Sequence, residues 1–258
     1  MHPMVTIAIR AARNAGNIIT RSYSHTESLN VTEKSRNDYV SEVDRLAEQE
    51  IIQTIRKSYP SHSFLAEETG TVDGNEYQWI IDPLDGTTNY LRGFPQFSVS
   101  IALKYRNKLE HAVVYDPLKD EIFSATRGQG AQLNDRKIRV TTRKELTGAL
   151  LGTGIPFRPD QDLDAYLVTL KAMIEDTAGV RRAGSAALDL AYVAAGRLDG
   201  FWEYGLKPWD LAAGVLLIQE SGGIVTDTDG NHDYLDNGNL LTGNINIHAE
   251  MLKRLQSC

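Results

Sequence analysis

The first part of the chain shows two patterns of apolar positions, one typical of helices and one typical of strands. Residues 4–22 have apolar side chains at helical spacing, and a second helix is expected after Ser41, ending at Pro60. The apolar positions of these two helices are Val5, Ala8, Ala12, Ala15, Ile19, Ile51, Ile52 and Ile55. Short apolar runs at 64–66 and 79–81 predict two strands, and acidic residues follow each of them.

Strict alternation over residues 97–105 predicts a further strand with one apolar face. Turn-forming residues at 106–108 and 116–120 bracket two more strands. Because these strands follow one another with short turns, we expect an antiparallel meander that is closed by residues 127–130.

From about residue 148 the pattern changes to alternating helices and strands. The expected helices are 162–175, 186–195, 211–220 and 247–256, and the expected strands are 201–202, 224–226 and 240–241. We find no repeat and no linker between an N-terminal half, about 1–147, and a C-terminal half, about 148–258. The sequence therefore predicts one domain over 1–258, built as layers of helix and sheet of the α/β or α+β class.

The composition fits an ordinary globular protein. The chain has 258 residues, of which 41% are hydrophobic and 24% are charged, and its net charge of −7 does not attract nucleic acid to the molecule as a whole. Its one cysteine is Cys258, so an intrachain disulfide and a zinc site built from several cysteines are excluded.

The N-terminal segment does not resemble a targeting sequence. Arg10 and Arg13 interrupt its apolar pattern, and no run approaches the roughly 18 apolar residues that a membrane span needs. We therefore expect a cytoplasmic protein that makes no membrane contact.

Candidate chemistry begins at Asp82-Pro-Leu-Asp-Gly86, directly after the apolar run at 79–81. Two carboxylates so close together repel each other, and one pKa rises unless a cation lies between them. Oxygen ligands, here the two carboxylates and the carbonyl of Leu84, favour Mg²⁺ or Ca²⁺. The alternative is an ordinary Asp-Pro-x-Asp-Gly turn, and these five residues alone do not decide between a turn and a metal site.

Other acidic residues have a plain structural explanation when each is taken alone. Glu67 and Glu68 follow the strand at 64–66 and could be two solvated glutamates, while Asp210 could cap the helix that it opens. Asp44 lies three residues after Ser41, where the first turn of a helix favours an acid. Arg181 and Arg182 are interpreted as surface charge or as part of an interaction face.

The residues Gly86-Thr-Thr-Asn89 favour the metal site. They stand where a helix is expected to start, and free backbone N–H groups there bind phosphate. A threonine hydroxyl beside the metal could orient a water molecule for attack. A polar helix cap would explain these four residues taken alone, but acids for a cation and amides for an anion within one decapeptide favour a site that binds a metal and a phosphate.

Three blocks of the sequence resemble the signatures of the inositol monophosphatase family. They are LAEET at 65–69, WIIDPLDGTTNYLRGFPQFSVSIAL at 79–103 and KPWDLAAGVLLIQESGGIVTD at 207–227, and the resemblance covers essentially the whole chain. Residues 125–134 and 184–203 are similar to the bacterial SuhB branch. The family implies a five-layer αβαβα sandwich and Mg²⁺-dependent hydrolysis of phosphate monoesters, with two or three ions that activate the attacking water.

The resemblance also implies roles for single residues. The role of metal ligand carries over to Glu67, Asp82, the Leu84 carbonyl, Asp85 and Asp210. Thr87 and Asp44 resemble the pair that orients the water, and Glu67 is also placed among the catalytic residues. The residues expected to bind the substrate are Gly86, Thr87, Gly184, Ser185, Ala186, Glu203 and Asp210. Glu68 resembles an acid behind the ligands, and Lys34 resembles a loop lysine near a metal, although its spacing to Asp44 is one residue shorter than in animal members.

Contacts to a ring by Ser185, Ala186 and Glu203 favour myo-inositol 1-phosphate as the substrate. Fructose 1,6-bisphosphate, adenosine bisphosphate and NADP remain open, because the acids serve only the phosphate. The family resemblance implies lithium inhibition and a homodimer. The SuhB branch implies a second possibility, a role in transcription antitermination and ribosomal RNA maturation with Nus factors, RNA polymerase and RNA as partners.

Overall fold

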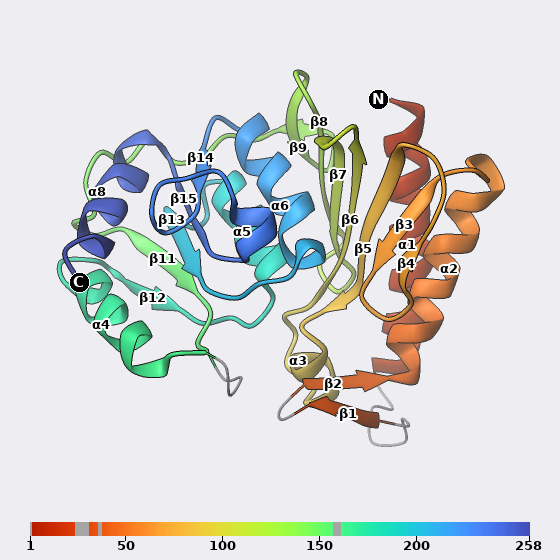
Figure 1. Ribbon diagram of the computed structural model, residues 1–258, viewed down its shortest axis with the longest axis horizontal. Helices are drawn as coiled ribbons and strands as arrows, with labels where there is room; N and C mark the ends of the chain where they lie inside the picture. The colour runs from red at the N-terminus through yellow and green to blue at the C-terminus, as the bar shows by residue number, and fades with distance from the viewer. Residues whose placement is uncertain (1, 24–30, 36–37, 157–160) are drawn as a thin grey trace.

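Two β-sheets and three layers of helices alternate in the structure (Figure 1). The computed structural model describes residues 2–23, 31–35, 38–156 and 161–258, with only the backbone for 31–35 and 38–41. The helices are α1 Pro3–Tyr23, α2 Glu42–Ser58, α3 Thr87–Leu91, α4 Leu163–Ile174, α5 Ala186–Ala194, α6 Pro208–Glu220, α7 Tyr234–Asn237 and α8 Ile245–Leu255.

The strands fall into a larger sheet, a smaller sheet and a hairpin. The hairpin is β1 Val31–Ser35 and β2 Asp38–Ser41. The larger sheet contains β3 Ser63–Ala66, β4 Gly70–Val72, β5 Tyr77–Asp85, β6 Ser98–Tyr105, β7 Lys108–Asp116, β8 Glu121–Thr126, β9 Gly130–Leu133 and β10 Arg136–Lys137. The smaller sheet contains β11 Leu150–Thr153, β12 Gly179–Arg181, β13 Gly200–Glu203, β14 Ile224–Thr226 and β15 Leu240–Gly243.

Within the described residues, the larger sheet has the order β10-β9-β8-β7-β6-β5-β3-β4, and the smaller sheet has the order β12-β11-β13-β15-β14. Among the strands that the structure describes, only β3 and β5 are parallel neighbours in the larger sheet, whereas β11 is parallel to both of its neighbours in the smaller one. Helices α1 and α2 cover one face of the larger sheet, α5 and α6 lie between the sheets, and α4 and α8 cover the far side (Figure 1). This arrangement confirms the expected αβαβα sandwich.

Small side chains bring α1 close to its neighbours. The buried residues of α1 are Val5, Ala8, Ala11, Ala12, Ala15, Gly16 and Ile19, and they share one core with Ile51 and Ile55 of α2. A Cβ atom on Gly16 would overlap the ring of Tyr115 on β7, so this position has room only for glycine. The helical spacing in the sequence therefore corresponds to a buried seam between the two helices and the sheet.

Strand β6 is buried on both faces, although its sequence alternates. Val99, Ile101 and Leu103 contact the α1–α2 side. The other face has small residues, among them Ser100, whose hydroxyl donates to the Trp209 carbonyl on α6 at 3.2 Å. Because a sheet covered by helices on both sides has no solvent face, its small polar residues are buried as well.

The two halves of the chain also share a core. The cluster between the sheets combines Ile80 and Ala102 from the first half with Leu190 and Leu216 from the second. We propose that 1–258 is a single domain on this ground.

Several elements differ from the sequence interpretation. The segment before Asp44 is a hairpin rather than a loop, and residues 127–129 form a turn into β9 instead of closing the meander. Strands β4, β11 and β12 and the short helix α7 were not expected, because each is too short for a periodic pattern. Within the described part of the chain, no helix is long and apolar enough to cross a bilayer.

Candidate active site

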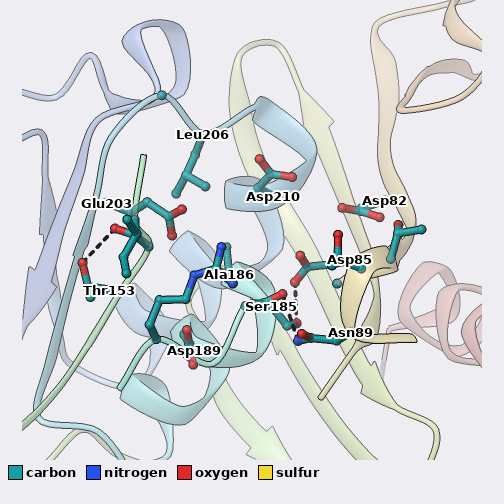
Figure 2. A pocket seen from close by; sticks show the side chains of 18 of the residues that line it. Asp82, Asp85, Asn89, Thr153, Ser185, Ala186, Asp189, Glu203, Leu206 and Asp210 are labelled. Carbon is teal, nitrogen blue, oxygen red and sulfur yellow. Dashed lines mark hydrogen bonds between the residues drawn. The ribbon is translucent and has the colours of Figure 1, made fainter. Parts of the chain in front are cut away.

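A cavity of about 170 Å³ lies between the C-terminal end of β5 and the N-terminal ends of α5 and α6 (Figure 2). Its wall contains eleven of the residues expected from the sequence, namely Glu67, Asp82, Leu84, Asp85, Gly86, Thr87, Gly184, Ser185, Ala186, Glu203 and Asp210. Asp44 and Glu68 stand behind this wall. Lys34 lies on β1, but its side chain is outside the described part of the chain, so its role stays a prediction.

A β-bulge at the end of β5 places the two aspartates. Asp82 pairs with Ser100 and Asp85 with Ser98, so two residues of β5 stand opposite one residue of β6. Pro83 lacks an N–H and is tolerated at such an interruption of the ladder. The N–H of Leu84 donates to Oδ1 of Asp82 at 3.0 Å.

Burial raises the pKa values of both aspartates in this wall, and for Asp82 the neighbouring acids raise the pKa further. Asp82 is 2% exposed, and its pKa is raised well above the usual range, first by burial and then by the negative charges of Glu67, Asp85 and Asp210. Burial raises the pKa of Asp85 to about 6, against the opposing hydrogen bonds from Ser185 and from the backbone of residues 186 and 187. The carboxylates are therefore close enough to disfavour one another's charge.

The donor set fits a hard divalent cation, because it consists of carboxylate and carbonyl oxygens that repel one another when no cation is present. Among the described residues, however, no group of three or more His, Cys, Asp and Glu side chains is already arranged to hold an ion. One oxygen of each aspartate accepts hydrogen bonds, Oδ1 of Asp82 from the Leu84 N–H and Oδ2 of Asp85 from the Ser185 hydroxyl. A metal role for these residues therefore stays a prediction.

Thr87 is joined to Asp44 across the fold. Its hydroxyl lies 2.9 Å from Oδ1 of Asp44 and 3.1 Å from the Leu84 carbonyl. A hydroxyl has one proton, and both neighbours are acceptors, so Oγ1 of Thr87 is left with lone pairs for a further donor. Asp44 is fully buried in the first turn of α2, where the helix dipole favours its charge.

The hydroxyl of Ser185 serves Asp85 rather than pointing freely into the cavity. It donates to Oδ2 of Asp85 at 2.6 Å, and the N–H of Ala187 donates to the same oxygen at 2.8 Å. These bonds join the end of β5 to the start of α5. What Ser185 presents to a ligand is therefore mainly its backbone.

The sequence analysis placed Asn89 at the end of the Gly86–Asn89 segment but gave it no role of its own. Its Nδ2 donates to the carbonyls of Gln96 and Ala183, both at 2.8 Å, and so ties α3 to the segment before α5. Gly86, at φ +98°, leaves room for this approach, because a Cβ there would lie 2.9 Å from the Gln96 carbonyl. No local sequence motif predicts such a contact between distant segments.

The far side of the cavity is built by β13 and α6. Glu203 ends β13, and Asp210 stands in the first turn of α6, where its Oδ2 accepts the N–H of Lys207 at 2.7 Å. Other lining residues that the sequence did not single out include Thr153, Gln161, Asp189 and Leu206. Arg182, interpreted above as surface charge or part of an interaction face, also lines the cavity. Asp189 had one available signal, an acid inside the apolar run 186–194.

Glu48 holds the strand end that carries Glu67. It is 1% exposed on α2, one turn after Asp44, and its carboxylate accepts the N–H groups of Glu68 and Thr69, both at 2.8 Å, as well as the Thr69 hydroxyl. One helix therefore orients both Thr87, through Asp44, and the backbone next to Glu67.

We expect Glu48→Gln to lower the free energy of unfolding by about 1 kcal/mol, because one of the partly buried N–H groups that it bonds loses its acceptor. Urea denaturation followed by circular dichroism measures the change. Glu145→Gln, an exposed site outside the cavity wall, is the matched control. Equal midpoints for the two variants would show that Glu48 does not hold this strand end.

Comparisons with known proteins agree over the full length. A model of the inositol monophosphatase family matches residues 1–258. The chain is 53% identical to a protein of Pseudomonas aeruginosa named Nus factor SuhB, over 99% of this chain and 97% of that one. The structure is similar to the crystal structure of the extragenic suppressor protein suhB from Bartonella henselae, with a TM-score of 0.95, 43% identity and 97% coverage of both chains. It is also similar to an inositol monophosphatase from Anabaena, with a TM-score of 0.86, 39% identity and coverage of 98% and 95%.

Proposed function

Because the chain belongs to the inositol monophosphatase family, we propose that it hydrolyses a phosphate monoester with Mg²⁺, and that its substrate is myo-inositol 1-phosphate. The observation that carries this proposal is the meeting of acids from three distant segments in one cavity. Glu67 follows β3, Asp82 and Asp85 end β5, and Asp210 opens α6. Their shared repulsion is the property that a divalent cation relieves.

Glu67, Asp82, Asp85, Asp210 and the Leu84 carbonyl would hold two or three Mg²⁺ ions. When bound, such ions supply positive charge for the phosphate and for the leaving oxygen, and they make water more acidic. The number of ions is part of the proposal.

The protein's own part in the reaction is to place a water molecule and the ester. With its proton directed to Asp44 or to the Leu84 carbonyl, Oγ1 of Thr87 accepts a hydrogen bond from the attacking water and fixes its direction. The backbone of Gly86 and Thr87, which lines the cavity, would hold phosphate oxygens.

The alcohol part of the ester would lie against Gly184, Ser185, Ala186 and Glu203 on the other side of the cavity. The volume of about 170 Å³ favours a small substrate over NADP, since pockets for larger ligands usually enclose about 300–1,000 Å³. Asp210, which lies between Glu203 and Asp82 (Figure 2), would contact the metal and the substrate.

A substrate panel at fixed Mg²⁺ tests this proposal. We expect the highest kcat/KM for myo-inositol 1-phosphate among this ester, fructose 1,6-bisphosphate, adenosine bisphosphate and NADP. We also expect EDTA to remove the activity and added Mg²⁺ to restore it. A higher kcat/KM for any other member of the panel would reject inositol phosphate as the substrate, and activity that persists in EDTA would reject the use of Mg²⁺.

We propose a second role in transcription antitermination, with Nus factors, RNA polymerase and RNA as partners. The relative from Pseudomonas aeruginosa that is 53% identical is named a Nus factor, which favours this role. A pull-down with the Asp85→Asn protein separates the two functions. Capture of transcription elongation factors by this variant, at the wild-type level, is the expected result, and loss of capture would make the second role depend on the cavity.

A homodimer and inhibition by lithium are further parts of the proposal. Leu163, Leu167, Val168 and Ile174 of α4 are between 47% and 52% exposed. Apolar side chains gathered on one exposed helix are typical of a protein–protein contact, so α4 is our candidate for the contact between subunits.

A further inference from the structure

Asp189 is a buried carboxylate in the wall of the cavity to which neither the family signatures nor the proposed mechanism gives a task. It lies on α5, is 2% exposed, and faces the cavity on the side of Glu203 (Figure 2). None of the residues that the structure describes donates a hydrogen bond to its carboxylate or forms an ion pair with it.

The small exposed part of Asp189 must open into the cavity. Throughout the described residues, every fully enclosed side-chain nitrogen or oxygen has a hydrogen-bond partner. The oxygens of Asp189 lack one, so they are not fully enclosed, and the cavity is the open space next to them. Burial of a carboxylate without a donor is unfavourable, and a ligand that supplies a donor removes this penalty.

The charges near Asp189 are those of Glu203, Asp85 and Arg182. Burial and the two acids raise its pKa well above the usual range, while Arg182 opposes the shift. The Arg182 side chain extends over Gly184, at 2.8 Å from where a Cβ would stand, and it is exposed. It therefore lies at the rim and leaves the buried carboxylate without a direct partner.

Glu203 is directed into the same end of the cavity. Its carboxylate lies so close to the backbone of Gly154 that a Cβ on this glycine would overlap it. Glu203 and Asp189 thus offer hydrogen-bond acceptors from β13 and α5, on the side of the cavity away from Asp82 (Figure 2).

We propose that Asp189 is a specificity-determining residue that, with Glu203, accepts hydrogen bonds from hydroxyl groups of a polyol ring. This inference rests on the proposed phosphatase function and deepens it. An alcohol without hydroxyls beyond the ester oxygen leaves Asp189 without a donor, and a site with an unpaired buried acceptor discriminates against such a ligand.

The test compares two esters, myo-inositol 1-phosphate and phenyl phosphate, whose ring has no hydroxyl groups. For Asp189→Ala we expect KM for the inositol ester to rise about tenfold or more with kcat within about threefold of wild type, because binding common to ground and transition state is lost. The kinetic constants for phenyl phosphate should not change. Gly154→Ala, which displaces Glu203, should produce the same pattern.

Thermal unfolding of Asp189→Asn without substrate separates recognition from a structural role. The melting temperature should stay equal to that of wild type or rise, because the amide removes a buried charge that has no partner. A clear fall in melting temperature, an equal loss for both esters, or an unchanged KM for the inositol ester would overturn the inference. A wild-type protein that hydrolyses neither ester would instead reject the proposed function, and the inference with it.

Discussion

Replacement of Asp85 by asparagine is expected to lower kcat for the Mg²⁺-dependent reaction by at least about a thousandfold, or ~4 kcal/mol of transition-state stabilisation. Asparagine keeps the size of the side chain but removes the negative charge that a cation needs. Steady-state hydrolysis of myo-inositol 1-phosphate measures the loss, and calorimetric titration with Mg²⁺ should show weaker binding.

The fold of Asp85→Asn should survive. With the amide oxygen in the place of Oδ2, the asparagine can still accept both the N–H of Ala187 and the hydroxyl of Ser185, so β5 stays joined to α5. Asp73→Asn, an exposed site away from the cavity, is the control for loss of one charge. Wild-type turnover by Asp85→Asn would remove the central ligand from the proposed site.

Replacement of Thr87 by valine is the second large effect that we expect. Valine has the shape of threonine without the hydroxyl, so the attacking water loses its acceptor, and kcat should fall by about 10²–10³. Mg²⁺ affinity should stay at the wild-type value, because the carboxylates are untouched. Thr87→Ser, which keeps the hydroxyl and its bond to Asp44, should recover most of the rate.

Calorimetry decides between this role and another one. If Thr87→Val loses Mg²⁺ affinity to the same degree as turnover, Thr87 supports the metal ligands instead of the water. If Thr87→Ser is as slow as Thr87→Val, the methyl group and not the hydroxyl matters.

The sequence predicted the long helices and the layered class because their signals are local and periodic. The seam of α1 repeats alanines at helical spacing, and any packing partner would give the same pattern. The burial of both faces of β6 had no such signal. Ser98 and Ser100 are polar, and only the presence of α5 and α6 above the sheet shows why small residues stand there.

The residues of the candidate site also fall into those that a local sequence signal predicted and those that it did not. Asp82, Asp85 and Thr87 lie within one short motif, so the sequence could place them together. Glu48 and Asn89 act through partners 20 and 94 positions away, and such contacts exist only after the chain has folded. Asp189 was hidden for a different reason, since an acid in the first turn of a helix has an ordinary explanation.

Helix α2 carries Asp44 and Glu48 on successive turns, one for the hydroxyl of Thr87 and the other for the backbone beside Glu67. Substitutions where α1 packs against α2 would therefore change kcat without touching the cavity, because they would shift the helix that carries Asp44 and Glu48. Relatives adapted to cold or heat could adjust catalytic speed by exchanging alanines there, while every acid of the cavity stays the same.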